Sequence, residues 1–130
     1  MREATKISLG GAVKMMRPTF EAYGEIETRT GLPLRSVYTA VVTGSATLET
    51  MATVVLVGMS QVDGQTQDAR TGQGISVEGV AERLYENGVW SDQVIGPIAD
   101  FLASLGWTPE QRKKIEAELA EQEGTTLPSA

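Results

Sequence analysis

The sequence predicts a mainly α-helical fold in which a short N-terminal β-hairpin packs on a small bundle of five to six helices. Three observations support this fold class. Only the first 16 residues alternate as strands do, the later stretches carry apolar residues at helical spacing, and most of these stretches lie between a capping residue and a glycine. A length of 130 residues suits a single domain. We divide it into residues 1–107, the hairpin plus helical domain, and residues 108–130, a charged helix and flexible tail.

The segment from Thr5 to Met16 predicts the hairpin. Gly10-Gly11 tolerates the positive φ angles of a two-residue turn. Apolar residues spaced by two lie on both sides of this turn, namely Ile7, Leu9, Val13 and Met15. Because two such short strands are not stable alone, we expect this apolar face to pack against a helix.

Two helices are predicted next. Thr19 is a good N-cap for a helix that runs to about Thr30, where Gly31 can adopt the left-handed cap conformation. Its expected apolar side consists of Phe20, Tyr23 and Ile26. The following helix, between Pro33 and Gly44, has the clearest amphipathic pattern in the chain, formed by Leu34, Val37, Tyr38, Val41 and Val42.

A third helix is predicted from about Thr47 to Met59, and it is apolar on nearly every side. Its apolar residues are Met51, Ala52, Val54, Val55, Leu56, Val57 and Met59. A buried strand is the alternative, but the length and the Thr47-Leu48-Glu49 start favour a helix. Such a helix must be covered, either as the central helix of the bundle or, in part, by a partner or a second subunit.

The polar stretch from Ser60 to Gly74 predicts a long flexible loop. Ser76 then caps a predicted helix that ends at Asn87-Gly88, and Ser91 caps another that ends at Gly106. Their apolar residues are Val77, Val80, Ala81, Leu84 and Tyr85 in the first, and Val94, Ile98, Phe101, Leu102 and Leu105 in the second.

The last predicted helix begins with a capping box, Thr108-Pro109-Glu110-Gln111. Its basic residues, Arg112-Lys113-Lys114, lie near the start and its glutamates near the end, which is the order that the helix dipole disfavours. Only Ile115 and Leu119 are large apolar residues inside it. We therefore expect this helix to fray and residues 124–130 to be disordered.

Composition excludes several classes of function. Eleven basic against 17 acidic residues give a net charge of −6, which disfavours binding to nucleic acid or to an anionic membrane surface. The chain has no Cys and no His, so it has no thiolate metal site and no nucleophile–histidine pair. We see no signal peptide and no long apolar run, and we expect a cytoplasmic protein with no metal, cofactor or small-molecule substrate.

The remaining chemical signals favour structural interpretations. Glu78, Glu82 and Glu86 stack on one helix face, which resembles a paired acid and base but is better explained as a solvated face. A calcium loop that starts at Asp63 would need a glutamate where Gly74 stands. We therefore predict no catalytic, cofactor-binding or metal-binding residues and no enzymatic activity.

Four parts of the chain resemble, in order, the tail assembly chaperone family of gene transfer agents and related tailed phages. They are KISLGG with MMRPTFEAYGEIETRTGLPL, then LETMATVVLVGM, then ISVEGVAERLYENG, and finally IADFLASLGW. The resemblance covers about Lys6 to Trp107. The chain departs from the usual pattern in its longer loop from Ser60 to Gly74 and in its sequence beyond Thr108.

The resemblance implies a small, non-enzymatic factor of the bacterial host cytoplasm that binds the tape-measure protein and tail tube subunits during tail morphogenesis and is absent from the finished particle. From the apolar residues we expect the partner-binding surface to consist of Met51, Val55, Met59, Ile115 and Leu119. The same surface is compatible with a homo-oligomer. The alternative is a small helical adaptor or transcriptional regulator, which would need a basic recognition helix.

Overall fold

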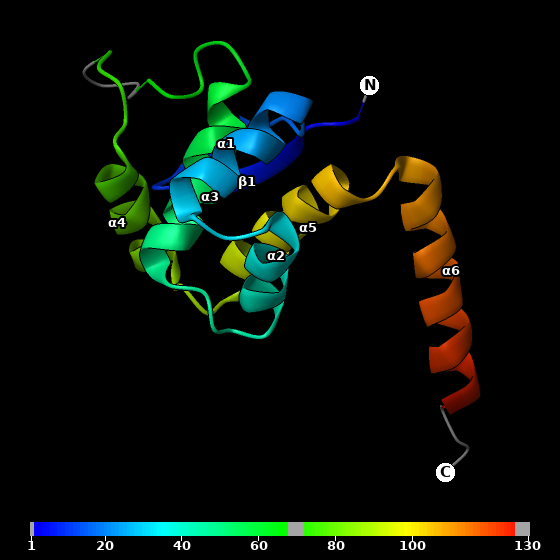
Figure 1. Ribbon diagram of the computed structural model, residues 1–130. Helices are drawn as coiled ribbons and strands as arrows, with labels where there is room; N and C mark the ends of the chain where they lie inside the picture. Colours follow the sequence, from blue (N-terminus) through cyan, green and yellow to red (C-terminus); the bar gives the residue numbers. More distant parts are fainter. Residues whose placement is uncertain (1, 68–71, 127–130) are drawn as a thin grey trace.

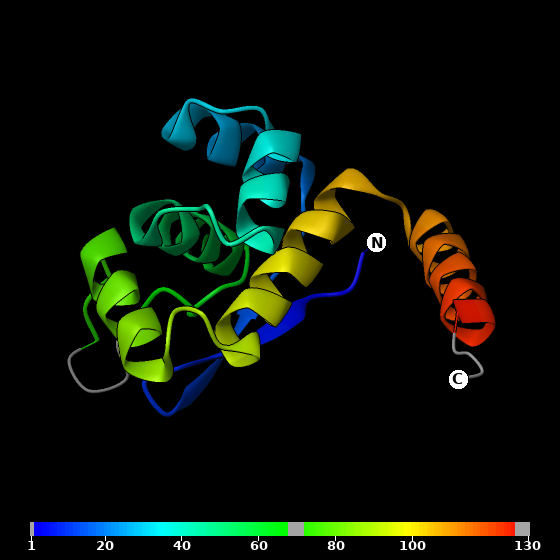
Figure 2. The same cartoon turned by 90° about the horizontal axis from the view of Figure 1, so that it is seen from below.

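The computed structural model describes residues 2–67 and 72–126. These residues form a two-stranded antiparallel hairpin and six helices, so the predicted fold class is confirmed. The hairpin and helices α1 to α5 pack together, whereas α6 projects to one side beyond the end of α5 (Figure 1 and Figure 2).

The hairpin consists of β1 (Thr5–Leu9) and β2 (Ala12–Met16). Gly10 and Gly11 have φ angles of 56° and 84°, as a tight turn between right-twisted strands requires. The turn pairs Leu9 with Ala12, and the register continues to the pair of Thr5 with Met16.

The predicted apolar face of the hairpin is correct on β1 and wrong on β2. Ile7 and Leu9 are buried, and Met16 is buried with them, whereas Val13 is exposed and Met15 is only half-buried. The reason is the register, because residues paired directly across a hairpin lie on the same face. A two-residue turn therefore places the even-numbered residues of β2 on the face of the odd-numbered residues of β1.

Helix α1 (Phe20–Thr30) begins and ends where the sequence predicts, but its apolar side is partly wrong. Thr19 Oγ1 accepts a hydrogen bond from the backbone N–H of Ala22 at 3.0 Å. Ala22 and Ile26, one turn apart, are the buried residues, whereas Phe20 is 91% exposed and Tyr23 is also exposed. Because α1 packs on α3, the small side chain of Ala22 permits the close contact, and the two aromatic rings remain at its edge.

Helix α2 (Leu34–Val42) follows a short loop and packs mainly on α5. Leu34, Val37 and Val41 are its buried residues, as the amphipathic pattern predicts. Val42, the last residue of that pattern, is exposed at the end of the helix.

Helix α3 (Leu48–Ser60) is the central helix, in contact with α1, α4, α5 and β2. It packs so closely on its neighbours at Gly58 that an added Cβ would lie 2.8 Å from Met16 Cβ and 2.9 Å from Phe101 Cζ. The Gly58 carbonyl also accepts a hydrogen bond from the N–H of Arg17 at 3.0 Å. The prediction of a buried helix is confirmed, with Leu56 only partly buried at its rim.

The described parts of the predicted loop after α3 are tied to the hairpin. Gln65 Oε1 accepts a hydrogen bond from the N–H of Met15 at 2.8 Å, and the carbonyl of Gln67 accepts one from Lys14 Nζ at 3.2 Å. The rest of that loop, residues 68–71, lies outside the described residues.

The last three helices are α4 (Val77–Asn87), α5 (Asp92–Gly106) and α6 (Pro109–Thr126). The capping box of α6 is confirmed, since the N–H of Thr108 donates to Gln111 Oε1 at 3.0 Å and the N–H of Gln111 donates to Thr108 Oγ1 at 3.2 Å.

Helix α6 extends to Thr126, so residues 124–126 of the predicted tail belong to its last turn. Strong helix formers fill most of α6 before Gly124 and favour a long helix despite the unfavourable order of charges, whereas Gly124, Thr125 and Thr126 are weak helix formers. The remaining residues of that prediction, 127–130, lie outside the described part of the chain.

Candidate functional site

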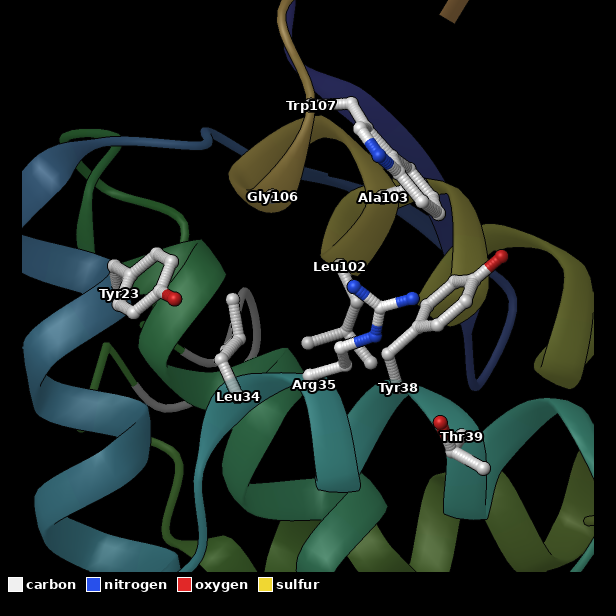
Figure 3. Close-up of a pocket in the computed structure, with 9 residues that line it drawn as sticks. All are labelled: Tyr23, Leu34, Arg35, Tyr38, Thr39, Leu102, Ala103, Gly106 and Trp107. Atoms are coloured by element: carbon white, nitrogen blue, oxygen red, sulfur yellow. The ribbon is translucent and has the colours of Figure 1, made fainter. Parts of the chain in front are cut away.

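An open groove lies where α1, α2 and the C-terminal end of α5 meet (Figure 3). Its volume is about 180 Å³. We call it the aromatic groove and define it by its lining residues, Tyr23, Leu34, Arg35, Tyr38, Thr39, Leu102, Ala103, Gly106 and Trp107.

The walls of the groove are aromatic. Tyr38 and Trp107 pack edge to face, with ring centroids 5.5 Å apart and ring planes at 88°, the geometry that aromatic quadrupoles favour. Trp107 is placed by the end of α5, where its N–H donates to the carbonyl of Ala103 at 2.9 Å and its backbone then turns extended. Tyr23 projects from α1 on the other side of the opening (Figure 3).

Arg35 is the charged residue in the lining of the groove. Its side chain is exposed and extends into the opening between Tyr23 and Tyr38 (Figure 3). Within residues 2–67 and 72–126 it makes no hydrogen bond or ion pair. The groove can therefore receive a large apolar side chain together with a carboxylate, which a free guanidinium binds through paired hydrogen bonds.

The partner-binding residues that we predicted on α3 are not accessible. Met51 is 3% exposed, and Val55 and Met59 are both 0% exposed. The hairpin, α1, α4 and α5 already cover the apolar side chains of α3, so this helix is buried by other parts of the same chain. The prediction that these three residues form a docking surface is therefore wrong, because they are buried in the folded chain.

The two predicted residues on α6 are at least partly accessible, since Ile115 is half-buried and Leu119 is 53% exposed. Both views place α6 beyond α5 and away from α3 (Figure 1 and Figure 2). The five predicted residues thus do not form one surface.

The start of α6 is held against α5 by Arg112. Its guanidinium donates to Ser104 Oγ at 2.8 Å and pairs with Asp100 Oδ1 at 3.0 Å. Lys113 and Lys114, the other members of the basic cluster, are exposed. One paired arginine and two lysines, followed by the glutamates of the same helix, do not make a basic recognition surface.

A second hollow, which we call the Trp90 hollow, lies at the other end of the α2–α5 pair and has a volume of about 390 Å³. Its lining residues are Val41, Val42, Thr43, Gly44, Trp90, Asp92 and Ile95. Trp90 itself is 89% exposed. Sequence reasoning missed Arg35, Trp90 and Trp107. The available signal was a tryptophan directly after Gly106 and another two residues after Gly88, each outside the apolar pattern of the predicted helices.

The carboxylates that we considered as acid and base groups are solvated. Glu78, Glu82 and Glu86 are all exposed, as the structural interpretation predicts. Within the described part of the chain, no three acidic side chains gather closely enough to hold a metal ion. None of the described helices has the length and apolar content needed to cross a membrane.

Comparisons with protein-family models, with curated proteins and with solved structures find no match to this chain. The function must therefore be argued from the aromatic groove, from the distribution of charge and from the motifs of the chain itself.

Proposed function

We propose that this protein is a non-enzymatic tail assembly chaperone of a phage or gene transfer agent. It binds the tape-measure protein and tail tube subunits in the cytoplasm of the bacterial host and is absent from the finished particle. The order of motifs from about Lys6 to Trp107 supports the proposal, because it is similar to the order in that family.

The aromatic groove is the observation that carries the proposal. A chaperone for long helical chains needs apolar surface that stays open until the client arrives. Tyr, Trp and Arg are the residue types that most often dominate binding energy at protein interfaces, and the groove contains all three. A net charge of −6 supports the same role, because it opposes association between copies that expose such a groove.

The chemistry of the groove favours binding over catalysis. Its ionisable side chains are Arg35 and the phenols of Tyr23 and Tyr38. Among the residues that the structure describes, no carboxylate lines the groove to pair with them as an acid or base. The alternative of a transcriptional regulator has less support, since Arg112 is already paired with Asp100.

Co-expression tests this proposal. The full chain is expressed with the longest helix-rich polypeptide encoded beside its gene, and the client is assayed for solubility and for co-purification with a tagged chain. We expect Trp107→Ala to weaken co-purification and Tyr85→Ala to leave it unchanged, because Tyr85 is an exposed aromatic on α4 and outside the groove. Thermal denaturation of both variants checks that each is folded.

Two results would count against the chaperone function. The first is a client that is equally soluble with and without the chain. The second is retardation of DNA by the chain at physiological salt, which would favour the regulator instead.

A further inference from the structure

The aromatic groove and the Trp90 hollow lie at opposite ends of the same helix pair. The groove is lined by the first half of α2 and the last residues of α5, whereas the hollow is lined by the end of α2 and the beginning of α5. Helices α2 and α5 pack on each other.

Helical periodicity places both openings on one flank of this pair. On α2, Arg35, Tyr38, Thr39 and Val42 follow the i, i+3, i+4, i+7 spacing of a single face. On α5, the corresponding stripe is Ile95, Ala99, Ala103 and Gly106. We call these eight residues, together with Trp90, Asp92 and Trp107 at the ends, the α2–α5 seam.

The dimensions of the seam fit one helix. Helix α5 has 15 residues, which corresponds to a length of about 22 Å and about four helical turns. Ala99 and Gly106 are small and at least partly accessible, so a partner helix can approach closely there, whereas Ala103 is 7% exposed and contributes to the lining of the aromatic groove. Trp90 and Trp107 stand at the two ends as aromatic anchors.

The two ends of the seam carry opposite charges. Arg35 lies at the Trp107 end and Asp92 lies at the Trp90 end. Both side chains are exposed, and within the described part of the chain neither makes a hydrogen bond or an ion pair. A bound helix is therefore favoured in one orientation, with an acidic residue at Arg35 and a basic residue at Asp92.

We propose that the α2–α5 seam is the client-binding site and that its occupant is one amphipathic α-helix of the client, about four turns long. This helix places large apolar side chains in the aromatic groove and in the Trp90 hollow, with an acidic residue facing Arg35 and a basic residue facing Asp92. The proposal rests on the proposed function, because it names the part of the client that the chaperone holds.

Binding of the purified full-length chain to the purified helix-rich client by titration calorimetry tests the seam. Two variants reverse the charges of the seam, Arg35→Glu and Asp92→Lys. Two controls make the same change in charge at exposed positions outside the seam, Lys114→Glu on α6 and Glu82→Lys on α4. A fifth variant, Trp90→Ala, removes the more exposed anchor.

We expect each seam variant to raise the Kd about tenfold or more, and each control to remain within about twofold of the unmodified chain. Circular dichroism and Tm of every variant confirm that the changes in affinity do not arise from unfolding. Reversing the client's acidic residue should restore affinity to Arg35→Glu and not to Asp92→Lys.

Three outcomes would overturn the proposal in different ways. Unchanged Kd values for all seam variants would place the client elsewhere and leave the chaperone function intact. A homo-oligomer that the same variants dissociate would make a second copy the occupant of the seam. No binding by the unmodified chain would reject the seam and the chaperone function together.

Discussion

Replacing Gly58 by alanine tests how tightly the central helix packs on the hairpin. In a helix interior, alanine is favoured over glycine by about 1 kcal/mol. At Gly58, however, the new methyl group would lie 2.8 Å from Met16 Cβ and 2.9 Å from Phe101 Cζ, whereas carbon atoms pack best at about 3.5–4.0 Å. The substitution therefore sets helix propensity against overpacking.

Overpacking should win because neither neighbour can move away easily. Met16 Cβ is bonded directly to the backbone of β2, and the ring of Phe101 is fully buried. Forcing extra carbon atoms into such a core costs about 1–3 kcal/mol. After the gain in propensity, we expect Gly58→Ala to lower the free energy of unfolding by up to about 2 kcal/mol, with a fall in Tm of up to several degrees.

Gly24→Ala is the matched control, because Gly24 lies inside α1 and an added Cβ there would meet nothing within 4 Å. It should leave the free energy of unfolding unchanged or raise it by up to about 1 kcal/mol. Urea denaturation followed by circular dichroism measures both variants. A Gly58→Ala protein as stable as Gly24→Ala would refute the close contact of α3 with β2 and α5.

Three further predictions concern the core and the caps. Met59→Glu should prevent folding or soluble expression, because an unpaired carboxylate in the core costs several kcal/mol. The control Leu119→Glu, at an exposed position, should express normally, and equal yields of the two variants would contradict the burial of α3. Thr108→Ala should speed hydrogen exchange in the first turn of α6 without changing the Tm of the domain, because it removes one half of the capping box. An unchanged exchange rate would show that the cap contributes little to the stability of this turn. Thr19→Ala should destabilise the domain by about 1 kcal/mol in thermal denaturation, since it removes the α1 cap together with a hydrogen bond to Gln61, and an unchanged Tm would argue against both.

The positions of the helices could be predicted because their limits depend on local chemistry. The hydroxyl groups of Thr19, Thr47 and Ser76 each accept a hydrogen bond from the N–H three residues further on. This geometry follows from residue type and spacing alone. The left-handed cap at Gly31, with φ of 71°, is local in the same sense.

The buried faces were less predictable because they depend on which elements pack together. Hydrophobic character alone assigned Phe20 to the core, but contact with α3 selects Ala22, whose small side chain lets two helices approach. On β2 the prediction chose the wrong alternate residues. The two-residue turn that identified the hairpin also fixes the register, and the register determines which residues of the two strands share a face. Combining the turn with the register would have placed Met16 in the core instead of Val13.

The candidate site escaped prediction because an apolar pattern does not say what covers it. Helix α3 carries the largest apolar excess, and in so small a bundle the excess is used entirely by the chain's own core. The surface that stays open is made by residues from separate elements, among them Tyr23, Arg35 and Trp107. No sequence window contains them together, so only the packing of α1, α2 and α5 reveals the groove.

Trp107 lies at the junction between α5 and α6. Its side chain lines the aromatic groove, and it also lines the cleft that α5 and the N-terminal segment form with α6. The next residue, Thr108, begins the capping box of α6. A client side chain that displaces the indole would therefore act on the segment from which α6 projects.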